Sequence, residues 1–232
     1  MVDNRRTVMA VQTLKHTYPK AHIVLRYSNP WELLVAVMLS AQCTDVRVNI
    51  VTAKLFKKYT SIADYLQADI VEFEKDIRPT GFYHDKAKHI LAAAQFTKCL
   101  VPKTMEEMLR IPGVGRKTAN VVLGNAYSVV AGIAVDTHVL RLSQRLRFVD
   151  LTKIGGRKLM VFERAGKIFI DYTKDADPVK VEKELMAVIP KKDWFGLTYF
   201  LIDHGRTTCR ARNPACAACT LKALCPSSRL QA

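Results

Sequence analysis

The chain has 232 residues, of which 49% are hydrophobic, so it is long enough to bury a substantial core and too apolar to be disordered throughout. It carries 36 Lys and Arg against 21 Asp and Glu, a formal net charge of +15, which indicates a polyanionic partner or an anionic membrane surface. The first residues, MVDNRRTVMA, lack the apolar segment of a secretory signal. The longest uncharged stretch, residues 118–135, contains Gly and Asn residues that disfavour a membrane span. We therefore expect an intracellular protein.

Helical periodicity dominates the rest of the chain. Apolar residues recur at three- and four-residue intervals in most segments, which is typical of amphipathic helices. In chain order, the expected helices cover residues 32–41, 45–58, 62–66, 70–77, 84–98, a short helix capped by Thr104 and Glu107, a helix that begins at Arg116, and residues 137–146, 156–170, 178–188 and 194–204. Residues 127–135 resemble a strand, but one strand alone has nothing to pair with. The sequence therefore predicts an all-α fold.

The segment IPGVG at residues 111–115 lies between two expected helices and indicates a helix–hairpin–helix motif. Gly113 and Gly115 allow the backbone to turn tightly and to approach a ligand closely. The amide groups at the start of the next helix favour an anion, and Arg116 adds positive charge. An ordinary helical hairpin with a glycine-rich turn is the alternative. The flanking helices and the basic character of the chain favour binding of a DNA phosphate.

Lys117 and Asp136 are the candidate catalytic residues. Lys117 follows the hairpin directly, and in a basic protein it could simply contact one more phosphate. A lysine amine held among cationic or apolar neighbours can instead form a Schiff base with a carbonyl-level carbon. Asp136 comes nineteen residues later, after the apolar run 132–135 and at an expected helix start. It could cap that helix, or it could face the amine, stabilise positive charge on a sugar and move protons.

Four cysteines with the spacing C-x6-C-x2-C-x5-C lie near the end of the chain: Cys209, Cys216, Cys219 and Cys225. Four thiolates this close in sequence can meet at one centre if the chain loops tightly, and the usual centres are iron–sulfur clusters and zinc. The spacing contains only one CxxC pair, unlike most zinc modules. Zinc stays an alternative because thiolates bind both metals. Cys43 and Cys99 stand apart and are expected to be buried in apolar packing.

Two arginines, Arg210 and Arg212, lie between the first two of these cysteines. A metal centre that fixes this loop would turn them into a rigid clamp for phosphates, whereas solvated loop charge is the alternative. His204 precedes the cysteines and is expected to end a helix rather than to bind metal, because four cysteines already suffice.

Three blocks of sequence carry a family resemblance: LLVAVMLSAQCTD at residues 33–45, IPGVGRKTANVVL with IAVDTH at residues 111–138, and HGRTTCRARNPACAACTLKALC at residues 204–225. In this order they resemble the endonuclease III family, within the helix–hairpin–helix superfamily of DNA glycosylases. The resemblance implies two helical domains with a DNA-binding cleft between them. Residues 22–131 would form a helical-barrel domain with the helix–hairpin–helix motif, and residues 1–21 with 132–232 a domain that holds a [4Fe–4S] cluster.

The resemblance also implies base-excision repair by a bifunctional enzyme that removes oxidised pyrimidines. The damaged base is flipped out of the duplex, the amine of Lys117 attacks the sugar C1′, and β-elimination from the Schiff base nicks the strand, with Asp136 as the catalytic carboxylate. Gln42 would fill the gap left by the base, Phe82 would wedge into the opposite strand, and His138 would line the site. The four clustered cysteines would hold the cluster. The implied partner is double-stranded DNA with damaged bases or abasic sites, bound by a cytoplasmic, nucleoid-associated monomer without membrane contact.

Two features depart from the family pattern, and two other functions stay open. Phe82 stands where an aliphatic residue is usual, and the interval from Lys117 to Asp136 is about one residue longer than the family leads us to expect. A monofunctional mismatch glycosylase would use an activated water and lacks the nucleophilic lysine. A non-catalytic, redox-sensing DNA-binding protein would need neither Lys117 nor Asp136.

Overall fold

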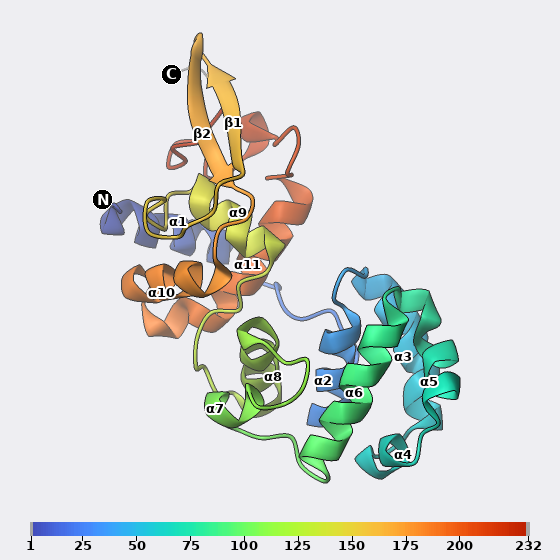
Figure 1. Ribbon diagram of the computed structural model, residues 1–232. Helices are drawn as coiled ribbons and strands as arrows, with labels where there is room; N and C mark the ends of the chain where they lie inside the picture. Colours follow the sequence, from blue (N-terminus) through green and yellow to red (C-terminus); the bar gives the residue numbers. More distant parts are fainter. Residues whose placement is uncertain (1, 231–232) are drawn as a thin grey trace. The chain divides into compact units, whose positions relative to one another are not determined.

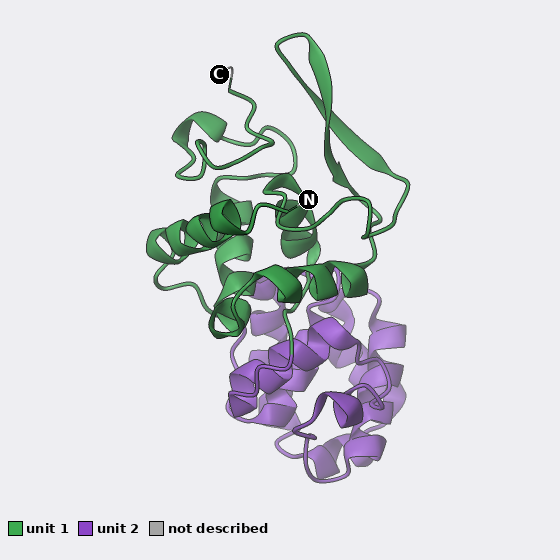
Figure 2. Cartoon of the chain, turned by 90° about the vertical axis from the view of Figure 1, so that its left-hand side faces the viewer, with its two compact units in different colours: residues 1–22, 132–232 green, residues 23–131 purple. Residues whose placement is uncertain are grey.

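The computed structural model describes residues 2–230, which are mostly helical, with one two-stranded sheet (Figure 1). The helical class expected from the sequence is confirmed. The chain divides into two compact units (Figure 2). Unit 1 comprises Met1–His22 and Gly132–Ala232, and unit 2 comprises Ile23–Ala131. None of the helices in the described part of the chain is long and apolar enough to cross a membrane.

Unit 2 is built from helices around the buried helix α2. Its elements are α2 (Pro30–Leu39), α3 (Asp45–Lys58), α4 (Ile62–Leu66), α5 (Ile70–Ile77), the short 3-10 helix η1 (Arg78–Thr80), α6 (Tyr83–Thr97), α7 (Met105–Met108) and α8 (Arg116–Tyr127). Asn29 caps α2 by accepting a hydrogen bond from the amide of Glu32, and Pro30 occupies the first turn, where its missing N–H costs little. Helix α2 then packs against α3, α6 and α8. Its burial on all sides explains why its sequence is apolar on every face.

Unit 1 joins the first helix of the chain to the C-terminal half. Its elements are α1 (Asn4–Thr17), α9 (Thr137–Arg145), β1 (Leu159–Arg164), β2 (Lys167–Thr173), α10 (Pro178–Val188), the 3-10 helices η2 (Lys191–Asp193) and η3 (Cys216–Ala218), and α11 (Trp194–Thr207). Helices α1 and α9 both pack against α11. Leu14 of α1, Leu142 of α9 and Leu201 of α11 are fully or almost fully buried in one shared core. The N-terminal helix is therefore part of the same core as the C-terminal elements.

The helix expected over residues 156–170 is wrong, because this segment forms the antiparallel hairpin β1–β2, which extends away from the helices of its unit (Figure 1). Ala165 and Gly166 form the turn with φ of 50° and 72°, the left-handed pair that suits the twist of a two-residue hairpin. Phe162 and Phe169 stack on one face with ring centroids 5.5 Å apart. Aromatic and β-branched residues are frequent in both strands and favour this hairpin over the helix that the apolar spacing predicts.

The bounds of most other helices agree with the expectation to within a few residues, and those of α3, α4, α5 and α10 agree with it residue for residue. Residues 128–136 carry neither helix nor strand, so the strand-like segment is a connection between α8 and α9. The expectation that Cys43 and Cys99 are buried is wrong: Cys43 is half-buried and Cys99 is exposed. Cys99 follows Lys98, whose positive φ of 57° ends α6 and turns the chain toward solvent.

We predict that replacing Gly166 by Val weakens the hairpin through the backbone alone. A Cβ at this position meets no atom within 4 Å, so the cost comes from holding a β-branched residue at φ 72°. Gly166→Asn has the same open surroundings but tolerates the left-handed conformation, and it is the matched control. The free energy of unfolding of Gly166→Val should be about 1–2 kcal/mol below that of Gly166→Asn in urea titrations. Equal stability of the two variants would contradict the turn assignment.

Candidate functional site

Unit 2 contains an open pocket of about 920 Å³, including its open side, between α2, α6 and α8. Its lining residues are Val37, Met38, Ala41, Gln42, Phe82, Asp85, Lys86, His89, Gly113, Lys117 and Thr118. The structure therefore brings together predicted site residues from three separate segments, namely Gln42, Phe82, and Gly113 with Lys117. Arg116 and Gly115 are adjacent to this set in the chain, at the start of α8.

The turn between α7 and α8 depends on Gly113. The amide of Val114 donates to the carbonyl of Ile111 at 3.1 Å, which closes the turn and leaves Gly113 at φ 77°. A Cβ on Gly113 would lie 2.8 Å from the Cβ of His89 on α6, so a larger residue is excluded by contact as well as by conformation. Gly115 is different, because a Cβ there meets nothing within 4 Å. The first glycine lets the turn pack against α6, and the second leaves the start of α8 open to an approaching ligand.

Lys117 lies in the first turn of α8, half-buried, with its side chain in the wall of the pocket. Gln42 and Phe82 also line this pocket, and both are exposed; Phe82 retains 63% of its accessible surface. Both have left-handed backbones, with φ of 54° for Gln42 and 49° for Phe82. An exposed aromatic ring on a strained turn is costly for stability alone, and such features gather at ligand-binding sites.

Asp136 and His138 belong to unit 1, where Asp136 caps α9. Its Oδ1 atom accepts hydrogen bonds from the amides of His138 at 2.9 Å and Val139 at 2.8 Å. These two bonds fix the orientation of the half-buried carboxylate. The Nδ1 atom of His138 lies 3.4 Å from the guanidinium of Arg141. The capping interpretation of Asp136 is therefore correct, and its catalytic role stays a prediction.

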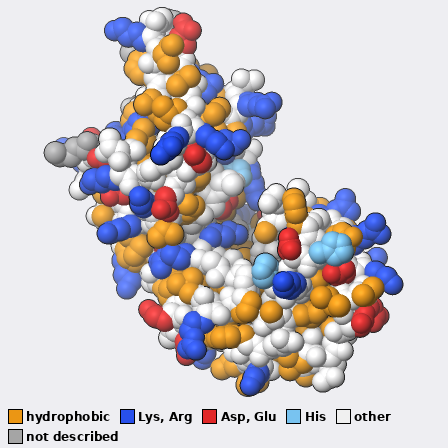
Figure 3. Space-filling view, in the orientation of Figure 1, with side chains coloured by type: hydrophobic (Ala, Val, Ile, Leu, Met, Phe, Trp, Pro, Cys, Tyr) orange, Lys and Arg blue, Asp and Glu red, His pale blue; other side chains and the backbone are white. Residues whose placement is uncertain are grey.

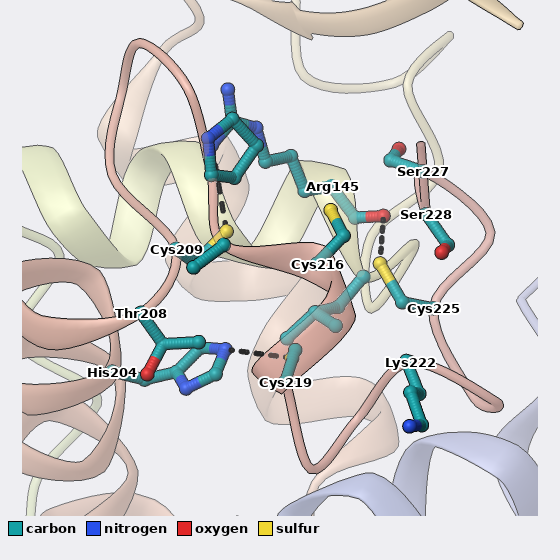
Figure 4. Close-up of a pocket in the computed structure, with 13 residues that line it drawn as sticks. Arg145, His204, Thr208, Cys209, Cys216, Cys219, Lys222, Cys225, Ser227 and Ser228 are labelled. Carbon is teal, nitrogen blue, oxygen red and sulfur yellow. Dashed lines mark hydrogen bonds between the residues drawn. The ribbon is translucent and has the colours of Figure 1, made fainter. Parts of the chain in front are cut away.

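The four clustered cysteines line one cavity in unit 1, of about 400 Å³ including its open side (Figure 4). None of the four forms a disulfide. Cys209 follows the end of α11, Cys216 begins η3, Cys219 follows its last residue, and Cys225 follows the next turn. Within the described residues, no three His, Cys, Asp or Glu side chains are placed to hold a single metal ion.

The electrostatics of this cavity disfavour thiolates that have no positive partner. Burial raises the pKa of the Cys225 thiol to about 12. Burial also raises the pKa of Cys219, and the nearby Cys209 and Cys216 raise it further. The thiolate forms of Cys219 and Cys225 are thus destabilised by desolvation and by neighbouring cysteines. A cationic centre in the cavity would stabilise all four at once.

Two contacts to the sulfur atoms come from side chains that the sequence analysis did not select as part of this site. Arg145 donates from Nη1 to the Sγ of Cys209 at 3.4 Å, and Nε2 of His204 lies 3.7 Å from the Sγ of Cys219 (Figure 4). Burial lowers the pKa of His204 to about 4, so its ring is neutral near pH 7. Its other nitrogen lies 2.9 Å from the hydroxyl of Tyr18, which follows α1. The first helix of the chain thereby supports the cysteine loop.

Arg145 is the strongest of these supports. Its Nε and Nη2 atoms bind both carboxylate oxygens of Asp171 on β2, at 2.6–3.0 Å. Nη1 also donates to the carbonyl of Arg210 at 2.7 Å, and Nη2 to that of Ala211 at 2.9 Å. Arg145 carries no local signal in the sequence, because the partners of its guanidinium are 26 to 66 residues away.

The side chains of Arg210 and Arg212 are exposed beside this anchored backbone. Figure 3 shows Lys and Arg side chains over much of the visible face of each unit, with fewer Asp and Glu. The loop therefore presents its two arginines from a fixed backbone, on a protein whose overall charge attracts polyanions.

We predict that Asp171→Asn strongly destabilises unit 1. Asp171 and Arg145 are both about 3% exposed at their side chains, so removing one charge leaves the other buried without its counterion. The loss should be about 3–5 kcal/mol in the free energy of unfolding, measured by urea titration. Glu163→Gln on the exposed side of β1 removes the same charge from the same hairpin and should change stability by less than about 0.5 kcal/mol. Similar losses in both variants would show that hairpin charge, rather than the buried pair, is responsible.

The chain is similar in sequence to known DNA repair proteins. A profile described as HhH-GPD superfamily base excision DNA repair protein matches residues 35–161. The chain is 42% identical over 231 residues to endonuclease III of Synechocystis sp., covering 97% of this chain and 94% of the relative. It is 40% identical over 232 residues to endonuclease III of Bacillus subtilis, with the same coverage.

Two solved structures share the fold. A non-covalent endonuclease III–DNA complex is similar at a TM-score of 0.83 and 38% identity, over 98% of this chain and 97% of that one. A trapped covalent endonuclease III–DNA intermediate is similar at a TM-score of 0.84 and 38% identity, over 98% of both chains. These similarities extend over both units.

Proposed function

The chain belongs to the HhH-GPD superfamily of base-excision DNA repair proteins, and on that premise we propose that it is a bifunctional DNA glycosylase with abasic-site lyase activity. It acts on double-stranded DNA, from which it removes oxidised pyrimidines before nicking the strand. The observation that carries the proposal is the amine of Lys117, which lies in the first turn of α8, directly after the hairpin, and in the wall of an open pocket. The covalent endonuclease III–DNA intermediate with 38% identity supports the same chemistry.

Lys117 supplies the nucleophile. Its neutral amine attacks the sugar C1′, the glycosidic bond breaks, and the damaged base leaves with the bonding electrons and takes up a proton. Loss of the remaining amine proton and opening of the sugar ring give a Schiff base between Nζ and C1′. The Schiff base acidifies the C2′ proton, and its removal expels the 3′ phosphate by β-elimination. Asp136 stabilises positive charge on the sugar, and its cap to α9 holds the carboxylate in one orientation.

The other selected residues would bind DNA. Gly113, Gly115 and Arg116 at the hairpin would contact phosphates, Gln42 would fill the gap left by the flipped base, Phe82 would wedge into the opposite strand, His138 would line the site, and Arg210 with Arg212 would clamp phosphates. The open space at Gly115 and the exposure of Gln42 and Phe82 support these roles. The aromatic ring of Phe82 is larger than the aliphatic side chain usual there, and it would set the preference for the opposite base.

Unit 2 would be the helical-barrel domain expected for residues 22–131, and unit 1 the cluster domain expected for residues 1–21 with 132–232. Cys209, Cys216, Cys219 and Cys225 would hold a [4Fe–4S] cluster. Their spacing contains one CxxC pair, unlike most zinc modules, and the family to which the chain belongs supports the cluster over zinc. When bound, the cluster supplies positive charge to the buried thiols and ties the loop to α11.

The two other candidate functions do not account for Lys117 and Asp136. A mismatch glycosylase that uses water has no need of an amine at position 117, and a non-catalytic redox sensor has no need of the Lys117 and Asp136 pair. We further propose a monomer that acts at the nucleoid in the cytoplasm, on the basis of its substrate and its net charge of +15.

We predict that Lys117→Gln abolishes covalent trapping by borohydride on duplex DNA with an abasic site. Only a Schiff base can be reduced to a stable protein–DNA bond, and glutamine cannot form one. DNA affinity should change by less than about threefold, because many other cations contact phosphates. Arg116→Gln is the matched control at the neighbouring position, and it should keep trapping at saturating protein. Wild-type trapping yields with Lys117→Gln would assign the nucleophile to another amine.

We also predict about four irons per chain in protein purified without oxygen, with broad visible absorption from sulfur-to-iron charge transfer. Cys219→Ser should lower iron content and the unfolding midpoint before it affects the chemical step, because cluster binding contributes folding free energy. Cys99→Ser removes an exposed thiol and should leave the iron content unchanged. One zinc per chain without iron would overturn the cluster assignment while leaving the Lys117 chemistry untouched.

A further inference from the structure

Lys86 on α6 is a buried lysine that the proposed chemistry does not use. Its residue surface is only 7% exposed, and its Nζ atom donates to two backbone carbonyls from separate elements. The carbonyl of Leu39 lies 2.8 Å away and that of Thr80 lies 2.9 Å away. One ammonium group therefore holds two segments that are about forty residues apart in the chain.

The position of Lys86 is unfavourable by local rules. It lies in the first turn of α6, at the positive end of the helix dipole, where a cation is disfavoured. Burial also lowers its pKa, which reflects the cost of removing the ammonium from water. Both acceptors compensate this cost, because Leu39 is the last residue of α2 and Thr80 the last of η1, so their carbonyls lie at negative helix ends. Lys86 is thus unfavourable by its burial and by its place in the helix dipole, and two carbonyl acceptors offset this cost. A residue at such a position indicates a functional constraint.

The two carbonyls stand at the roots of the two loops that line the pocket. Residues 40–43 follow Leu39 and form a turn closed by a bond from the amide of Cys43 to the carbonyl of Ser40 at 3.1 Å, with Gln42 at φ 54°. Gly81 and Phe82 follow Thr80 with φ of 68° and 49°. Left-handed backbone at a residue with a side chain persists only where the surroundings hold it. The Lys86 ammonium holds both loops at the point where each leaves its helix.

We propose that Lys86 is a positioning residue that sets the spacing between the Gln42 loop and the Phe82 loop, so that both side chains enter the duplex together at a flipped nucleotide. This inference rests on the proposed function, because it assumes that the two side chains contact DNA. Lys86 itself touches neither the reacting atoms nor the DNA in this role. It acts through the backbone carbonyls of Leu39 and Thr80, and its loss should affect recognition of the lesion more than binding to undamaged duplex.

The test compares Lys86→Met with wild type in binding to two duplexes, one undamaged and one with a stable tetrahydrofuran abasic-site analogue. Methionine keeps the length and apolar stem of lysine but leaves both carbonyls without their donor. The ratio of the two affinities should fall about tenfold or more, because a small displacement of positioned groups has large effects. This ratio does not depend on the fraction of protein that is folded, since an unfolded fraction lowers both affinities equally. Lys88→Met, which removes an exposed lysine from the same helix, is the matched control and should leave the ratio unchanged.

A mutant cycle shows whether Lys86 acts through the two loops. In a Gln42→Ala, Phe82→Ala background, Lys86→Met should have no further effect on the ratio, because the side chains that it positions are already absent. Lys86→Arg, which retains donors for both carbonyls, should recover part of the lost discrimination. An unchanged ratio in Lys86→Met, or an equal loss in the double-alanine background, would overturn the proposal. Failure of wild type to give a borohydride-trapped complex would instead overturn the proposed function, so the two failures are distinguishable.

Discussion

The buried ion pair between Arg145 and Asp171 is the interaction on which most of unit 1 depends. A guanidinium offers five donors in a fixed plane, and here they are shared among the carboxylate, two loop carbonyls and the sulfur of Cys209. One side chain thus connects α9, the hairpin and the cysteine loop. Because the loop has little regular structure of its own, its shape comes from this charge and from the metal centre that its thiols would bind.

Features governed by neighbouring residues could be predicted from the sequence. The helix bounds follow from capping residues and periodicity, as at Asp69 before α5 and Asp177 before α10. The tight turn at Gly113 can be predicted from its glycines. The helical fold class can be predicted from capping and periodicity, and that prediction is confirmed. Lys117, Asp136 and the four cysteines were selected by type and spacing. Their catalytic and ligating roles stay predictions, whereas their local placement is now described.

Features governed by distant contacts could not be predicted. In the sequence, Arg145 and Lys86 look like ordinary cations on helices. The partners of the Arg145 guanidinium are 26 or more residues away, and Leu39, which accepts a hydrogen bond from Lys86, is 47 residues away. The hairpin at residues 159–173 did carry a signal, because Ala165-Gly166 separates two short segments rich in aromatic and β-branched residues. Its apolar content is nevertheless compatible with a helix in a short window, and only pairing across the turn decides between them.

Lys86 in unit 2 and Arg145 in unit 1 both bind backbone carbonyls where a loop begins or runs. A loop that exposes side chains to a large ligand makes few contacts of its own, so its backbone must be fixed from inside the protein. A buried cation does this efficiently, because it can bind several carbonyls that no helix or sheet satisfies. Lys86, a compact charge, holds two helix ends near one point, whereas the planar fork of Arg145 spans a strand and a loop. This chain therefore carries exposed cations, which give it its net charge of +15, and buried cations, which bind the backbone carbonyls of two loops.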